Sequence, residues 1–160
     1  MVRLGKMTDY GLVLMSVIAR CQGLSLHSAR DLAKESNLPL STVRKLLKGL
    51  LHSGLLASHR GIRGGYILAR DPQEITVMDI IAAFEGPLTL TECSSDTAGL
   101  CKLEMNCPIS KNQQIINQAV RQALGTISLS DLIHPLQLVA VKDARGGFLP
   151  ALRSVPGRVQ

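Results

Sequence analysis

The sequence has few aromatic residues and no long apolar run. Of its 160 residues two are Phe, two are Tyr and none is Trp, although 46% are hydrophobic. A core must therefore be built from Leu, Ile, Val, Ala and Met, which favours helices. No apolar stretch approaches the roughly 20 residues that span a bilayer, and residues 1–6 do not lead into a secretory signal. We therefore expect a cytoplasmic protein without a membrane partner.

Signs of an enzyme are also missing. The chain shows no nucleophile–base pair, no cofactor fingerprint and no phosphate-binding loop beyond one glycine-rich turn at 60–65. The sequence therefore predicts neither an enzyme nor a small-molecule substrate. Its four cysteines do not indicate a disulfide framework in a reducing compartment.

Basic residues are concentrated in the first half of the chain. In residues 1–72, 11 Lys and Arg stand against 4 Asp and Glu, whereas 7 stand against 8 in the remainder, for a net charge of +6. This asymmetry indicates that the first half binds a polyanion. A basic surface that is only solvated would have the same composition, so charge alone does not establish that the partner is a polyanion.

The hydrophobic pattern predicts a mainly α fold with a small β-hairpin. Three helices are expected, at about 8–21, 29–36 and 41–53. Each begins at a residue that can cap it, namely Thr8, Ser28 and Ser41. Two short apolar runs then flank the glycine-rich turn, as in a hairpin. This order describes a winged helix-turn-helix domain in residues 1–72.

The remainder predicts two more helices separated by a loop with three cysteines. The first runs from Thr76 to about Glu85 and the second, after about twenty residues, from Pro108 to about 125–127. One stripe of the long second helix is apolar: Ile109, Ile116, Val120, Ala123 and Ile127. We expect this stripe to form a homodimer, with packing on its own domain as the alternative. Residues 73–134 would thus hold the cysteine loop and dimerisation helix, and 135–160 a flexible tail.

The third helix and the hairpin carry residues suited to DNA. Opposite its apolar face the helix has short or basic side chains, which suit the major groove: Ser41, Thr42, Arg44, Lys45 and Lys48. In the hairpin, Arg60 and Arg63 flank a turn in which Gly64 and Gly65 let the backbone approach a narrow minor groove. The two features together predict that the partner is double-stranded DNA.

The remaining histidines and the first cysteine receive plain interpretations. His27, His52 and His59 have no mutual metal-ligand spacing, so we interpret them as surface or phosphate-contacting residues. Cys21, at the end of the first helix, is interpreted as a small buried hydrophobe.

The cysteine loop has the donors of a metal centre. Cys93, Cys101 and Cys107 could bind zinc or an iron–sulfur cluster as thiolates. With no further Cys or His nearby, the last ligand would be an oxygen, a distant His or a group from another subunit. The carboxylates considered are Glu92, Asp96, Glu104 and the remote Asp9. A zinc-bound or metal-free DNA-binding protein, or an iron–sulfur carrier or redox enzyme, remains the alternative.

Several segments resemble the IscR/NsrR-type winged-helix regulators, over residues 1–133. They are 6–11, 38–43, 60–66, 75–81 and the cysteine loop, and 85–93 looks most like the branch that regulates the SUF iron–sulfur assembly system. The resemblance implies a homodimer that binds a palindromic operator through the third helix and wing. It also implies that Cys93, Cys101 and Cys107 hold an iron–sulfur cluster, 2Fe-2S or 4Fe-4S.

The resemblance also bears on the fourth ligand and the signal. IscR-like members have a His three residues after the last cysteine, where this chain has Ser110. NsrR-like members use an Asp of the partner subunit near the start of the first helix, which Asp9 matches. The implied function is a cluster-sensing regulator of SUF-type genes. The alternatives are a nitric-oxide or redox-sensing repressor of the same type and a zinc-bound or metal-free regulator.

Overall fold

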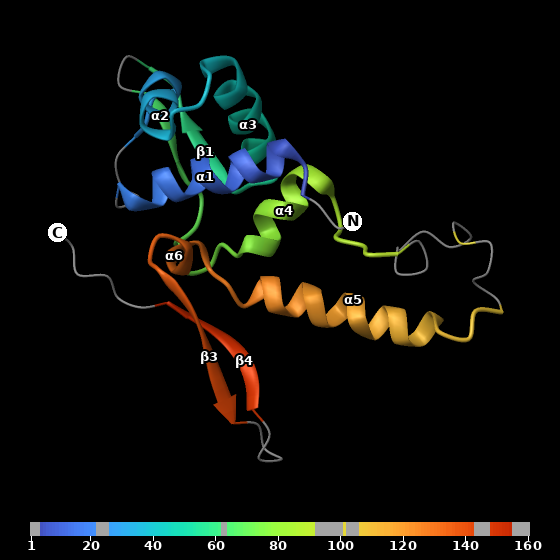
Figure 1. Cartoon of the computed structure of the whole chain (residues 1–160). Coiled ribbons are helices and arrows are strands. Elements are labelled where there is room, and N and C mark those ends of the chain that lie inside the picture. The colour runs from blue at the N-terminus through green and yellow to red at the C-terminus, as the bar shows by residue number, and fades with distance from the viewer. Residues whose placement is uncertain are drawn as a thin grey trace.

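The computed structural model describes residues 4–21, 26–61, 64–91, 101, 106–142 and 148–154. Within these residues the chain is mainly helical, with two separate two-stranded antiparallel sheets (Figure 1). The elements in chain order are α1 Lys6–Arg20, α2 Ala29–Ser36, α3 Leu40–His52, β1 Leu56–His59, β2 Gly65–Leu68, α4 Val77–Glu85, α5 Ser110–Gly125, α6 Leu129–Leu132, β3 Leu136–Lys142 and β4 Phe148–Ser154.

The first three helices enclose an aliphatic core. α3 contributes Val43, Leu46, Leu47 and Leu50, all at most 1% exposed, and α1 contributes Leu14, Met15 and Ile18, which are fully buried. Full burial of one such side chain stabilises the fold by about 1.5–3 kcal/mol. The same periodicity leaves the polar face of α3 toward solvent. The structure thus confirms the predicted fold class, mainly α with a small β-hairpin.

Of the four residues predicted at the starts of the first four helices, Ser28 and Thr76 cap their helices, whereas Thr8 and Ser41 do not. The Ser28 hydroxyl accepts a hydrogen bond from the Asp31 amide, and Thr76 forms a capping box with Asp79. Thr8 and Ser41, in contrast, lie inside their helices. Thr8 is fully buried and its hydroxyl donates to the Glu85 carboxylate, 2.5 Å away. α3 already starts at Leu40, and Pro39 takes the N-cap position: its backbone is extended, with ψ of 136°, and its carbonyl accepts hydrogen bonds from the Thr42 and Val43 amides.

The wing packs directly on the helical unit. β1 pairs with β2 in a register that places His59 opposite Gly65. The backbone of His27, between α1 and α2, joins this sheet: its amide donates to the Tyr66 carbonyl and its carbonyl accepts from the Tyr66 amide. A Cβ at Gly65 would lie 2.7 Å from the His27 carbonyl oxygen. Glycine is therefore required at position 65, where β2 meets the backbone of His27.

α4 connects the winged unit to the rest of the chain. It packs on α1 and α3 and inserts the Phe84 ring between Gly11 of α1 and Gly49 of α3. The Glu85 carboxylate accepts hydrogen bonds from Thr8 and from the Gly5 amide. Both hydrogen bonds lower the pKa of Glu85 below its usual value, and they tie the start of α1 to the end of α4.

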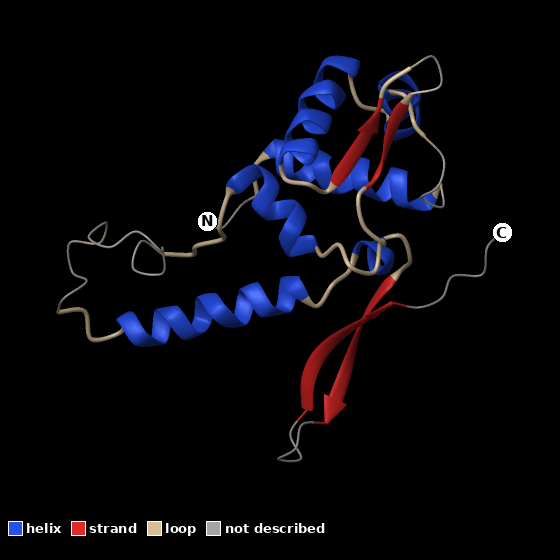
Figure 2. Ribbon diagram, turned by 180° about the vertical axis from the view of Figure 1, so that it is seen from behind, coloured by secondary structure: helices blue, strands red, loops and turns tan. Residues whose placement is uncertain are grey.

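α5 projects from the domain. Near its C-terminal end a small apolar cluster of Val77, Ile81 and Ile127 joins it to α4. Figures 1 and 2 both show its N-terminal end extending away from α1, α2 and α3. Asn117 is 5% exposed, and its side-chain oxygen accepts a hydrogen bond from the Leu90 amide.

The segment predicted as a flexible tail contains a β-hairpin. β3 and β4 pair along their full length, from Leu136 opposite Ser154 to Lys142 opposite Phe148. The expectation of a structureless tail gave the glycines and prolines of this segment more weight than its β-forming run, Leu136–Lys142, which contains Val139 and Val141. The structure corrects that expectation for the two strands.

None of the helices in the described ranges is both long and apolar enough to cross a membrane.

Candidate nucleic-acid interface and cysteine loop

The outer face of α3 presents the predicted DNA-contacting residues together. Ser41, Arg44, Lys45 and Lys48 are exposed and Thr42 is half-buried. The turn that precedes α3 is formed by Asn37, whose φ of 55° ends α2, and by Pro39. α2 packs on α3, so the turn sets the angle at which α3 is presented.

A basic hollow lies toward the C-terminal end of this face. Lys45, Lys48 and His52 line it together with Gly49 and Leu51, around an open volume of about 620 Å³. Within the described residues one salt bridge is present, in which a guanidinium nitrogen of Arg70 and a carboxylate oxygen of Asp79 are 3.8 Å apart. No described carboxylate therefore forms a salt bridge with either lysine of the hollow. Cations without a nearby carboxylate on an exposed helix face favour binding of a polyanion.

The wing tip is a tight turn whose own backbone requires glycine. The Gly64 amide donates to the Gly61 carbonyl across the turn, and Gly61 has a φ of 127°. A Cβ at Gly64 would lie 2.3 Å from the His59 carbonyl oxygen, which excludes any larger residue in this conformation. Arg60 is exposed, whereas Arg63 lies outside the described residues.

The structure describes part of the cysteine loop. Cys101 and Cys107 are half-buried and neither is in a disulfide, while Cys93 lies outside the described residues. The Cys107 carbonyl accepts a hydrogen bond from Ser110, the first residue of α5. The N-terminal end of α5 extends away from α1 (Figures 1 and 2).

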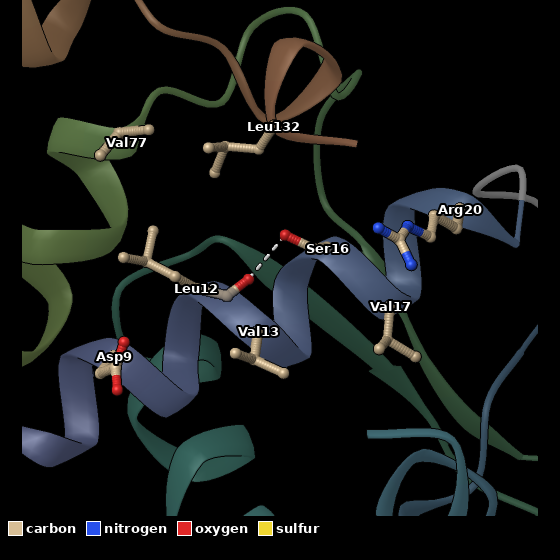
Figure 3. A pocket seen from close by; sticks show the side chains of 8 residues that line it. All are labelled: Asp9, Leu12, Val13, Ser16, Val17, Arg20, Val77 and Leu132. Atoms are coloured by element: carbon tan, nitrogen blue, oxygen red, sulfur yellow. Dashed lines mark hydrogen bonds between the residues drawn. The ribbon is translucent and has the colours of Figure 1, made fainter. Parts of the chain in front are cut away.

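Asp9 is exposed on α1 at one end of a shallow groove (Figure 3). The groove has a volume of about 310 Å³ and its floor is mostly apolar, with Val77 of α4 and Leu132 of α6 facing α1. Val13, in the middle, is 42% exposed, and Arg20 lies at the other end. This face of α1 therefore offers one carboxylate and an accessible apolar strip.

Two plain interpretations from the sequence are wrong. Cys21 is exposed rather than buried in the core, and His27 is 8% exposed rather than a surface residue. The Cys21 thiol donates to the Glu35 carboxylate, with sulfur and oxygen 3.6 Å apart. Partial burial of the sulfur, followed by repulsion from Glu35, raises the pKa of Cys21. The sequence could not indicate this proximity because it depends on how α2 packs on α1.

Comparison with known proteins decides the family. Residues 4–135 match the Rrf2 family, described as an iron-dependent transcriptional regulator. The chain belongs to the Rrf2 family. Rrf2 regulators bind DNA and typically act as dimers. The match covers the winged helix, the cysteine loop, α5 and α6.

The chain is similar to two differently named regulators, CymR and IscR. The chain is 33% identical to CymR of Bacillus subtilis over 77% of its own length and 83% of that protein. It is 28% identical to IscR of Xenorhabdus nematophila, over 71% and 68% of the two chains. Among solved structures it is similar to CymR, the global cysteine regulator of B. subtilis, with a TM-score of 0.68, 30% identity and coverage of 83% and 97%. It is also similar to IscR of T. potens, with a TM-score of 0.62, 27% identity and coverage of 82% and 86%.

These Rrf2 relatives are transcriptional regulators and not enzymes, in agreement with the prediction from the sequence. The chain is therefore a DNA-binding transcriptional regulator.

Proposed function

We propose that this Rrf2 regulator is a homodimeric iron–sulfur sensor that represses, or both represses and activates, genes of SUF-type cluster assembly. The observation that carries the proposal is that three cysteines, Cys93, Cys101 and Cys107, precede α5 in the sequence of a chain whose α3 has an exposed basic face. A DNA-binding regulator works where the chromosome lies, so the proposal includes a cytoplasmic location.

The proposed DNA contacts combine α3 with the wing. Arg44, Lys45 and Lys48 would contact base edges and phosphates in the major groove, with Ser41 and Thr42 at the leading end of the helix. Arg60, Arg63, Gly64 and Gly65 would bring the wing to the minor groove. Two copies would bind a palindromic operator whose half-sites lie about one helical turn, or a multiple of it, apart.

The proposed dimer uses α5. Ile109, Ile115 and Ile116 are 51%, 64% and 50% exposed, although apolar side chains on a projecting helix normally find a partner surface. A second copy of the same helix is the economical partner, since a twofold interface is self-complementary. Crossed α5 helices would then fix the distance between the two recognition helices.

The donors present fit an iron–sulfur cluster. Thiolates are the ligands such clusters prefer, and Cys101 and Cys107 are both partly accessible. Cys107 lies just before the N-terminus of α5, where the helix dipole favours negative charge. When bound, the cluster would supply a redox-active and chemically labile group.

The same proposal assigns the fourth ligand to Asp9 of the partner subunit. Asp9 is exposed on α1, and the N-terminal end of α5 in the same chain extends away from α1 (Figures 1 and 2). A ligand from a second chain would link α1 of one protomer to the loop of the other. Loss of the cluster would break this link, so the cysteine loop and the recognition helix α3 would change position together.

A second candidate function is cysteine-responsive regulation without an iron–sulfur cluster. It is favoured by the similarity to CymR, whose solved structure carries the description of a global cysteine regulator. The three cysteines would then be thiols or zinc ligands. Nitric oxide or oxidants as the signal are variants of the first candidate, since they would act on the same cluster.

Anaerobic purification tests the cluster directly. We expect a brown protein with equal amounts of iron and sulfide, and loss of both in Cys101→Ala, because one of three thiolate ligands is removed. Cys21→Ala is the matched control and should keep iron and sulfide. A colourless protein that cannot be reconstituted, with or without stoichiometric zinc, would favour the second candidate.

A further inference from the structure

A second group of metal-ligating side chains lies in the winged-helix domain, apart from the cysteine loop. Cys21 follows the last residue of α1, His27 lies between α1 and α2, and Glu35 is in the last turn of α2. One ligand atom from each, a sulfur, a ring nitrogen and a carboxylate oxygen, lies within 4.8 Å of the other two. Among the described residues, no other trio of His, Cys, Asp and Glu converges in this way.

The spacing of these atoms suits a tetrahedral ion. With Zn–S of about 2.3 Å and Zn–O of about 2.1 Å, sulfur and oxygen on one tetrahedral ion are about 3.6 Å apart. The Cys21 sulfur and the nearest Glu35 oxygen are 3.6 Å apart. The His27 ring nitrogen lies within 4.8 Å of both of these atoms. A short movement of the imidazole therefore brings this nitrogen to the third position on the ion.

We propose that Cys21, His27 and Glu35 bind one Zn²⁺ or a similar divalent ion, with a fourth position open to water. One thiolate, one imidazole and one carboxylate form a mixed donor set that a borderline-soft ion accepts. The two anionic ligands balance the charge of the ion. Only one sulfur is available here, so this set suits a single ion and not an iron–sulfur cluster.

The position of His27 gives the site a structural consequence. His27 is 8% exposed, and both of its backbone hydrogen bonds to Tyr66 hold it against β2 of the wing. Gly65 allows this close approach. A bound ion would therefore join the end of α1, the end of α2 and the wing. Because α2 packs on α3, the ion would also stabilise the arrangement of α3 relative to the wing.

The test uses the full-length chain with Cys93, Cys101 and Cys107 all replaced by Ser. Cys21 is then the only thiol, because the chain has four cysteines. Titration with Co²⁺ is expected to give a thiolate-to-cobalt charge-transfer absorption that saturates at one ion per chain and is displaced by Zn²⁺. Zn²⁺ is also expected to raise Tm.

Variants of the two exposed ligands identify the site. Adding Cys21→Ser should abolish the charge-transfer absorption. Adding Glu35→Gln should weaken Co²⁺ binding more than about tenfold, since losing an outer-shell partner alone costs about 10–100-fold. Glu74→Gln, at an exposed acid outside the trio, is the matched control and should leave affinity unchanged.

The absence of a charge-transfer absorption, or Co²⁺ binding that is insensitive to Glu35→Gln, would overturn this proposal. Its failure is distinguishable from failure of the cluster proposal. The triple Ser variant lacks the proposed cluster ligands but keeps this site, whereas Cys21→Ser in the otherwise native chain keeps the cluster ligands.

Discussion

Gly11 illustrates how a single residue is constrained by a neighbour far away in the sequence. A Cβ at this position would lie 2.3 Å from the Phe84 ring, which α4 inserts between α1 and α3. In an open helix, Gly→Ala stabilises by about 1 kcal/mol. Here the ring must move within a packed core, which costs about 1–3 kcal/mol.

We therefore expect Gly11→Ala to lower Tm by several degrees in thermal denaturation, although the substitution raises helix propensity. Gly125→Ala is the control, because a Cβ at that helix-terminal position meets no atom within 4 Å. It should leave Tm unchanged or raise it. Equal Tm values for the two variants would show that Phe84 does not occupy this space.

The Glu85 carboxylate makes a pH-dependent contact between α1 and α4. Its folded-state pKa is lowered by the hydrogen bonds from Thr8 and Gly5. A lowered pKa means that the contact stabilises the fold above the unfolded pKa, and that this stabilisation is lost as pH falls through the folded value. The side chain is exposed, so the effect is small.

Glu85→Gln is therefore expected to lower Tm slightly at pH 7. The difference from the native chain should shrink as the pH falls below about 4.5. Thermal denaturation of both proteins from pH 7 to pH 3 measures it. A difference that stays constant over this range would exclude the carboxylate as its source.

At the scale of elements, we expect α3 and the wing to act together as one DNA-contacting unit. Lys45 is exposed on α3, and no described carboxylate neutralises it. If it contacts a phosphate, Lys45→Ala should weaken DNA binding and reduce the slope of log K against log salt by about one unit. Fluorescence anisotropy at several salt concentrations measures this slope.

Lys111→Ala is the matched control, because Lys111 is an equally exposed lysine on α5. It should leave both affinity and slope unchanged. An unaltered slope in Lys45→Ala would place DNA on another face.

The elements differ in how far the sequence predicts them. Helices α1 to α4 follow from apolar periodicity, and the wing follows from the glycines between two short apolar runs. The predicted caps Thr8 and Ser41 are wrong because the Thr8 hydroxyl instead donates a buried hydrogen bond to Glu85, and because the N-cap position of α3 is taken by Pro39, whose carbonyl accepts from the Thr42 and Val43 amides. The β3–β4 hairpin is not predicted because the glycines and prolines of residues 135–160 indicate a tail more strongly than the β-forming run Leu136–Lys142 indicates a strand.

At the scale of the whole molecule, α5 is expected to hold two copies together. Ile116 is 50% exposed on this projecting helix. Ile116→Glu would bury a charge at the dimer interface and should raise the dimer dissociation constant at least about tenfold. Analytical ultracentrifugation measures the change, with Gln118→Glu, exposed on another face of α5, as the control.

If both variants remain dimeric at the same concentration, another surface forms the dimer.

The candidate sites show where prediction from sequence ends. The DNA-contacting face of α3 could be predicted, since helical spacing alone separates Lys45 and Lys48 from the buried Leu46 and Leu47. The convergence of Cys21, His27 and Glu35 could not, because these residues meet only when α2 packs on α1 and His27 pairs with the wing.

In the proposed function, an iron–sulfur cluster controls DNA binding. The most direct test is the dissociation constant for a duplex that the protein itself selects from a random pool, measured anaerobically before and after removal of the cluster. If the cluster controls binding, we expect the dissociation constant to change by about 5–150-fold, the usual range of allosteric coupling. Equal dissociation constants for the two forms would contradict it.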